Sequence, residues 1–114
     1  MEVRVTAQLK PGYHVNSNTP SEDYLIPLRL TWDAKPLEVA AISYTKPTME
    51  RYEFAEKPLS VLSGDFDIMT RFKVPANAPS GLGILAGKLR YQACSEKACL
   101  PPRNVDVRVT YELR

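Results

Sequence analysis

Cys94 and Cys99 are the two cysteines of this 114-residue chain, and four residues separate them. Two thiols this close can form a disulfide, act as a redox pair or contribute to a metal site. A disulfide here would constrain the unfolded chain little, because closing so short a loop is worth roughly 2 kcal/mol, against more than about 4 kcal/mol for a bridge spanning most of a domain. Strained or exposed bridges are the ones that exchange readily. The spacing therefore favours a redox-active pair over a structural bridge.

Other chemistries for these cysteines need groups that the sequence supplies poorly. Zinc takes about four ligands, or three plus water, and His14 is the single histidine. A nucleophilic Cys–His hydrolase would use one cysteine and a third group that orients the histidine, and no such group is evident. We therefore expect no metal and no other cofactor. A structural disulfide in a non-catalytic binding module stays open as the alternative.

Alternating apolar and polar residues predict the strands that position the cysteines. The clearest alternation runs from Phe66 to Val74 and from Val105 to Leu113, with a shorter run from Val3 to Ala7. Further strands are expected at Tyr24–Trp32, Leu37–Tyr44 and Gly83–Ala93.

Turn residues separate these strands and set the fold class. Lys10-Pro11-Gly12 and Ser63-Gly64-Asp65 are turn sequences, and residues 75–81 form a loop that contains two prolines. At Met49–Glu56 we expect at most a helical turn, because prolines bound the segment. About seven short antiparallel strands in this length predict an all-β domain, an immunoglobulin-like β-sandwich.

The same alternation places the cysteines at one end of the sandwich. Cys94 ends one strand, and Cys99 precedes the last strand after a short hairpin. With Leu89, Tyr91 and Ala93 facing the core, Cys94 falls on the other face of the strand. We therefore expect its sulfur to lie near solvent.

Composition narrows the class of protein. The net charge is +2 with the signs interspersed, so nothing resembles the basic stripe of a nucleic-acid-binding domain. The longest apolar runs are far shorter than the roughly 20 residues of a membrane helix. The length fits one domain covering residues 1–114, which we expect to be a mature or excised domain.

Two stretches of the sequence resemble a known family. The hairpin Tyr91-Gln92-Ala93-Cys94, followed by Ala98-Cys99-Leu100-Pro101-Pro102, resembles the active-site hairpin of the N-terminal domain of the DsbD family of thiol:disulfide interchange proteins. The stretch Gly12–Pro20 is similar to the family's early strand and loop. The order of the strands matches along nearly the whole chain.

The resemblance implies a periplasmic electron relay. It implies that a thioredoxin-like C-terminal domain of the same protein is the electron donor, and that periplasmic disulfide isomerases or cytochrome c maturation thioredoxins are the acceptors. Onto this chain it carries the catalytic cysteines, Cys94 and Cys99. The spacing of the two cysteines varies within the family, so the spacing of four found here leaves the choice of partner open.

The resemblance also points to residues around the cysteines. The family shields its disulfide with an aromatic residue on a cap loop, which corresponds here to Met49–Glu56, where Tyr52 and Phe54 both fit. His14 falls where family members carry an aromatic residue, and Tyr91 belongs to the cysteine motif. Ordinary packing is the alternative role of these side chains.

The implied reaction is thiol–disulfide exchange through a mixed disulfide. By analogy with the family, Cys99 would attack and Cys94 would resolve the intermediate. A chaperone-like domain that binds an exported metalloprotein without using either cysteine is a third possibility, since a fold does not determine a function.

Overall fold

A computed structural model describes residues 1–22 and 24–114 of the chain. These residues form ten strands and no helix, in three antiparallel sheets with the orders β1-β7-β4, β10-β8-β3 and β5-β6-β2-β9. The strands are β1 (Glu2–Gln8), β2 (His14–Asn16), β3 (Arg29–Asp33), β4 (Glu38–Tyr44), β5 (Thr48–Glu50), β6 (Leu59–Ser63), β7 (Asp65–Lys73), β8 (Gly81–Tyr91), β9 (Ala93–Cys94) and β10 (Arg103–Leu113). The predicted all-β, immunoglobulin-like sandwich is confirmed, with ten strands instead of about seven.

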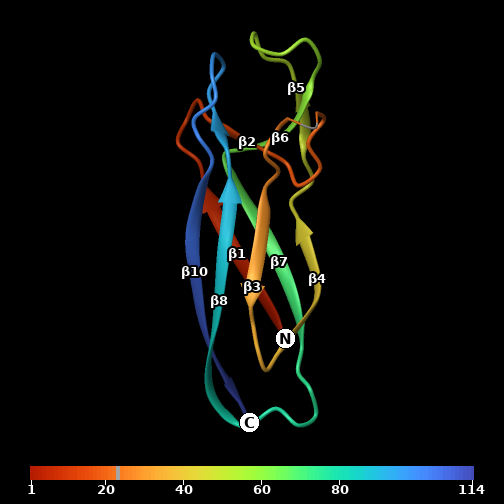
Figure 1. Cartoon of the computed structure of the whole chain (residues 1–114), viewed down its shortest axis with the longest axis vertical. Helices are drawn as coiled ribbons and strands as arrows, with labels where there is room; N and C mark the ends of the chain where they lie inside the picture. Colours follow the sequence, from red (N-terminus) through yellow and green to blue (C-terminus); the bar gives the residue numbers. More distant parts are fainter. Residues whose placement is uncertain (23) are drawn as a thin grey trace.

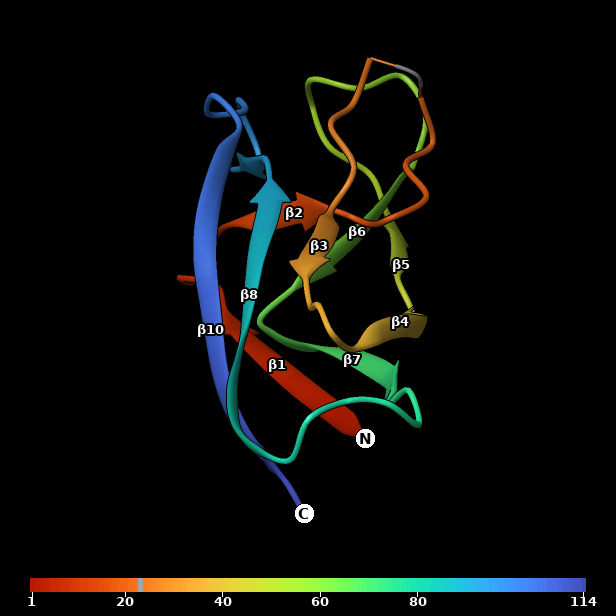
Figure 2. The same cartoon turned by 60° about the horizontal axis from the view of Figure 1, so that its bottom comes forward.

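The two sheets of longer strands run along the long axis of a molecule that measures 53 × 21 × 20 Å (Figure 1). Figure 2 shows them as two layers, with β1, β7 and β4 on one side and β10, β8 and β3 on the other. Strand β7 shows how the sequence builds this core, because Phe66, Ile68 and Phe72 are buried and alternate with more exposed neighbours. The main core joins apolar side chains of all three sheets, namely Val15, Leu28, Leu30, Leu62, Phe66, Ile68 and Leu89.

Trp32 of β3 fills the middle of the sandwich. Its ring packs edge-on against Phe72, and its indole Nε1 donates a hydrogen bond of 3.0 Å to the hydroxyl of buried Thr70. Gly87 of β8 leaves the space for the indole, since a Cβ there would lie 2.9 Å from the ring. The tryptophan thus ties the two layers together.

The third sheet, β5-β6-β2-β9, lies at the end of the sandwich opposite the C terminus (Figure 1). The alternation of apolar and polar residues did not predict β2, β5 and β6, and the family resemblance alone placed an early strand within Gly12–Pro20, where β2 lies. Strands β2 and β6 are buried at nearly every position, so they lack the alternation that marks a half-buried strand. These short strands matter because β9, which carries Cys94, pairs with β2.

Three predicted elements need correction. The strand expected at Tyr24–Trp32 begins only at Arg29, because Pro27 lacks a backbone donor and Leu25 turns into a separate apolar cluster. The helical turn expected at Met49–Glu56 is shorter than that segment: Thr48–Glu50 is strand β5, paired with β6, and a single turn follows, closed by a hydrogen bond from the Ala55 amide to the Tyr52 carbonyl. The strand expected at Gly83–Ala93 is interrupted at Gln92, where the chain leaves the sheet of β8 for that of β2.

Candidate functional site

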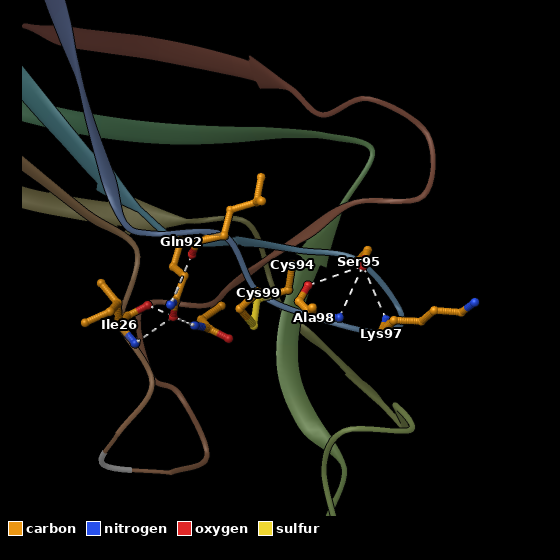
Figure 3. Close-up of a disulfide and its surroundings, with 9 residues drawn as sticks. Ile26, Gln92, Cys94, Ser95, Lys97, Ala98 and Cys99 are labelled. Atoms are coloured by element: carbon orange, nitrogen blue, oxygen red, sulfur yellow. Dashed lines mark hydrogen bonds between the residues drawn. A yellow bond between two sulfur atoms is a disulfide. The ribbon is translucent and has the colours of Figure 1, made fainter.

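Cys94 and Cys99 form a disulfide with an S–S distance of 2.09 Å (Figure 3). Two backbone hydrogen bonds of 2.8 Å flank the pair, one from the Ser95 amide to the Ala98 carbonyl and one from the Leu100 amide to the Ala93 carbonyl. This pattern makes the cysteines a non-hydrogen-bonded pair of an antiparallel hairpin, the kind whose Cα atoms approach most closely. Their Cα atoms are 3.9 Å apart, closer than the roughly 4.4–6.8 Å common for disulfides.

The turn between the cysteines is held by Ser95. Its hydroxyl oxygen accepts hydrogen bonds from the amides of Lys97 (3.2 Å) and Ala98 (3.3 Å), a serine turn that fixes the backbone locally (Figure 3). Glu96 and Lys97 are exposed at the tip. Because these bonds do not involve sulfur, the hairpin has support that is independent of the disulfide.

The two sulfur-bearing residues differ sharply in exposure. Cys94 is 1% exposed, whereas Cys99 is among the exposed residues. The expectation that Cys94 lies near solvent is wrong, and the break at Gln92 is the reason. Beyond that break the strand joins β2, so the alternation of β8 no longer decides which side faces water. Of the two residues, Cys99 is therefore the one that presents surface to an incoming partner.

Gln92 holds the start of the hairpin in place. Its side-chain oxygen accepts hydrogen bonds from the side chain of Asn16 (3.4 Å) and the amide of Ile26 (3.5 Å), and its nitrogen donates to the Leu100 carbonyl (3.4 Å) (Figure 3). One side chain thus joins β2, the loop before β3 and the second arm of the hairpin. Gln92 and Asn16 lie within the motifs that resemble the family, but the sequence assigned neither a role; a polar residue two positions before Cys94 was the usable signal.

The structure brings three of the sequence-predicted neighbours together. His14 is the cross-strand partner of Cys94, so both side chains lie on one face of the end sheet. The Tyr52 ring stacks on His14 with 4.0 Å between centroids, and Phe54 follows at 5.6 Å from Tyr52 and 6.4 Å from His14. The three rings are nearly parallel, with interplanar angles of 14°, 15° and 2°. They form an aromatic stack that begins beside the buried cysteine.

Tyr91 does not join that stack. It is half-buried, packs against the main core and lines a groove of about 300 Å³ together with Tyr13, Leu100 and Pro101. Leu100 directly follows Cys99 and is 47% exposed. The groove, which Lys10 and Arg103 also line, is therefore a mixed apolar and basic surface next to Cys99.

The segment that carries the aromatic residues has its own anchor. Leu25, Leu59 and Val61 form a small cluster, and Tyr52 and Ala55 pack against it. This cluster is separate from the main core. Tyr52 is half-buried and Phe54 is 37% exposed, so Tyr52 is fixed more firmly than Phe54.

Burial sets the protonation of two of these rings. Desolvation lowers the pKa of His14, which keeps the imidazole neutral at pH 7. Desolvation, followed by the charges of Glu50 and Glu96, raises the pKa of Tyr52. The charge of Glu96, at the tip of the cysteine hairpin, thus acts on Tyr52 in the aromatic segment.

The described residues contain no group of three or more histidine, cysteine or acidic side chains arranged to hold a metal ion. Within the same part of the chain, no helix has the length and apolar character needed to cross a bilayer.

Comparison with known proteins identifies the family. The model of the family described as "Thiol:disulfide interchange protein DsbD, N-terminal" matches residues 1–110. The chain belongs to this family. No curated protein gives a significant match.

A solved structure supports the DsbD N-terminal fold. The chain is similar to the reduced form of the DsbD N-terminal domain from Neisseria meningitidis, with 18% sequence identity and a TM-score of 0.60 over 97% of this chain and 81% of that one. The predicted family resemblance is thereby confirmed. Domains of this family are periplasmic, and the Cys94–Cys99 pair is suited to the thiol:disulfide interchange for which the family is named.

Proposed function

We propose that this domain relays electrons in the periplasm by reversible opening of the Cys94–Cys99 disulfide. The observation that carries the proposal is the exposed Cys99 bonded to the buried Cys94 in a short hairpin of a DsbD N-terminal domain. An exposed cysteine bonded to a buried one suits an attacking and resolving pair, because the rate of exchange depends on access to the sulfur.

The exchange proceeds in two steps. In the reduced domain, the Cys99 thiolate attacks a disulfide of the oxidised partner, and one partner sulfur leaves as a thiolate that takes up a proton. The Cys94 thiol then loses its proton and attacks Cys99, which re-forms the bridge and releases the second partner thiol. Two electrons and two protons pass to the partner, so the domain acts as a protein-disulfide reductase.

The domain must itself be reduced by another protein, because the site holds only its own two sulfurs. We propose a thioredoxin-like C-terminal domain of the same protein as the donor. Periplasmic disulfide isomerases and cytochrome c maturation thioredoxins are the proposed acceptors. On this proposal, residues 1–114 are one domain of a larger bacterial inner-membrane protein.

A matched pair of variants tests the assignment of the two cysteines. Cys94→Ser leaves the exposed Cys99 free, so it should trap an oxidised thioredoxin-like partner as a stable mixed disulfide. Cys99→Ser leaves only the buried Cys94 and should trap little. Non-reducing electrophoresis and mass spectrometry measure both adducts. Equal trapping by the two variants, or efficient trapping by Cys99→Ser alone, would contradict the assignment.

The aromatic segment gives the proposal a second test. The stack of Tyr52 on His14 supports a shielding role for this segment beside the disulfide. Tyr52→Ala should open the site and speed reduction of the bridge by a small thiol such as glutathione. Phe54→Ala should have a smaller effect, since Phe54 is more exposed and further from His14. The shielding role fails if neither variant changes the rate.

A further inference from the structure

His14 is a buried titratable residue that has no role in the two exchange steps described above. It is 3% exposed, and its ring nitrogen Nε2 has no hydrogen-bond partner among the described residues. A buried polar atom without a partner costs free energy, because it gives up its hydrogen bonds to water and gains none in return. An apolar ring at this position would stack on Tyr52 without that cost, so the imidazole calls for an explanation.

The position of His14 supplies one. In the register of β2 and β9, His14 lies directly across from Cys94, which in turn pairs with Cys99. Directly opposed residues of antiparallel strands have their Cβ atoms about 4.5–5.5 Å apart. A row of side chains therefore runs across the sheet from His14 to the buried Cys94 and then to the exposed Cys99. The ring of Tyr52 covers one side of the His14 ring, with 4.0 Å between the two centroids.

The buried cysteine is also the one that needs help with its proton. The proposed exchange requires Cys94 to become a thiolate in the resolving step. Removal from water disfavours a thiolate, and Cys94 is 1% exposed. Cys99, by contrast, is exposed and can lose its proton to solvent.

We propose that His14 accepts the proton of the Cys94 thiol during the resolving step of the exchange. This inference rests on the proposed function. The Cys94 S–H bond breaks, the proton moves to the free imidazole nitrogen, and the resulting thiolate attacks Cys99. The bond between Cys99 and the partner breaks, and the departing partner thiolate takes a proton from the imidazolium or from water. The same path in reverse returns the proton to Cys94 when the bridge is reduced.

The groups around His14 leave its imidazole neutral and able to accept a proton. Burial lowers the pKa of His14, so the ring is neutral and able to accept a proton at pH 7. Tyr52 stays protonated because burial and the charges of Glu50 and Glu96 raise its pKa. On the other side, the cross-strand partner of His14 is Ser63, which carries no charge. The Cys94 thiol is the proton source that the sheet itself places opposite the ring.

The test follows the mixed disulfide with glutathione over time. Reduced domain is mixed with oxidised glutathione, samples are quenched with acid, and mass spectrometry counts the glutathionylated and the re-oxidised protein. His14→Phe keeps a ring that can stack on Tyr52 but cannot take a proton. At pH 7 its resolving step should slow by about tenfold. This is less than the 10²–10⁴-fold that general-base catalysis can supply, because a thiol is already fairly acidic.

The pH profile separates proton transfer from packing. Near pH 10, where hydroxide ionises Cys94 directly, His14→Phe should approach the wild-type rate. A variant that is equally slow at every pH would overturn the inference, and so would one that resolves at the wild-type rate at pH 7. The first step, measured in a Cys94→Ser background, should not depend on His14. Ser63→Ala changes the other cross-strand neighbour and should leave the profile unchanged.

Two further measurements keep the inference testable. If His14→Phe does not fold, His14→Gln provides a smaller side chain that also lacks a titratable nitrogen, with the same expected profile. In the reduced wild-type domain, the imidazole should titrate differently by NMR from the imidazole of a Cys94→Ala variant, and identical titrations would argue against the transfer. If the wild-type domain forms no mixed disulfide at all, the proposed function fails too; if it exchanges but the His14 variants match it, this inference alone fails.

Discussion

Reduction of the Cys94–Cys99 bridge should cost the domain little stability. The bridge joins residues five positions apart, so it closes a ring of about six residues, and the chain-entropy relation assigns such a ring about 2 kcal/mol. For a domain of 114 residues, this corresponds to a fall in the melting temperature of about 9 °C. The reduction potential of the disulfide should therefore be only about 45 mV lower in the folded domain than in the unfolded chain.

The contacts around the hairpin explain why the reduced domain should stay folded. Strand β9 pairs with β2, and two backbone hydrogen bonds flank the cysteines, and reduction breaks none of these bonds. Gln92 still links the hairpin to Asn16 and Leu100. None of these contacts passes through sulfur, so the end sheet has no need of the disulfide to persist.

Denaturant titration of the oxidised and reduced protein measures the difference. The fluorescence of Trp32, the single tryptophan, reports the core, and far-ultraviolet circular dichroism reports the strands. A double variant, Cys94→Ser with Cys99→Ser, controls for any direct effect of the reductant and should be insensitive to it. A loss above about 4 kcal/mol, or unfolding on reduction, would mean that the bridge is a structural one and would refute the reasoning from loop length.

Three other changes probe the parts of the fold that support the site. Gly87→Ala places a Cβ 2.9 Å from the Trp32 ring and should cost about 1–3 kcal/mol in a denaturant titration, with the sandwich layers forced apart. The pKa of His14 is lower in the folded state than its unfolded value of 6.5, so the contribution of the neutral imidazole to stability should be fully present above pH 6.5 and should be lost as the pH falls through the folded-state pKa. His14→Phe should make the stability depend less on pH in this range. Gln92→Ala removes three hydrogen bonds and should speed amide hydrogen exchange at Leu100 while leaving exchange in β7 unchanged.

The sequence predicted the sandwich better than the sheet that carries the site. Strand β7 buries one face and β10 half-buries one, so their period of two is visible without a structure. Strands β2 and β6 are covered on both faces, and β9 has two residues, so none of them leaves a readable pattern. The cysteine pair was recognisable from its motif, but the burial of Cys94 depended on which strand lies beside it. Pairing between segments about 80 residues apart cannot be read from local alternation.

The position of the site at the end of the sandwich has a consequence for its chemistry. The long sheets are held together by Trp32, Phe72 and the main core, which Ala93 of the hairpin contacts but to which neither cysteine belongs. In the end sheet, Cys94 of the short strand β9 pairs with His14 on one side and with Cys99 on the other. Opening the bridge therefore changes the bonding at one margin of a sheet while the sandwich stays as it is. A domain that must exist in both redox states benefits from this separation, because the free energy of exchange is then set by the two sulfurs and their immediate neighbours and not by refolding of the core.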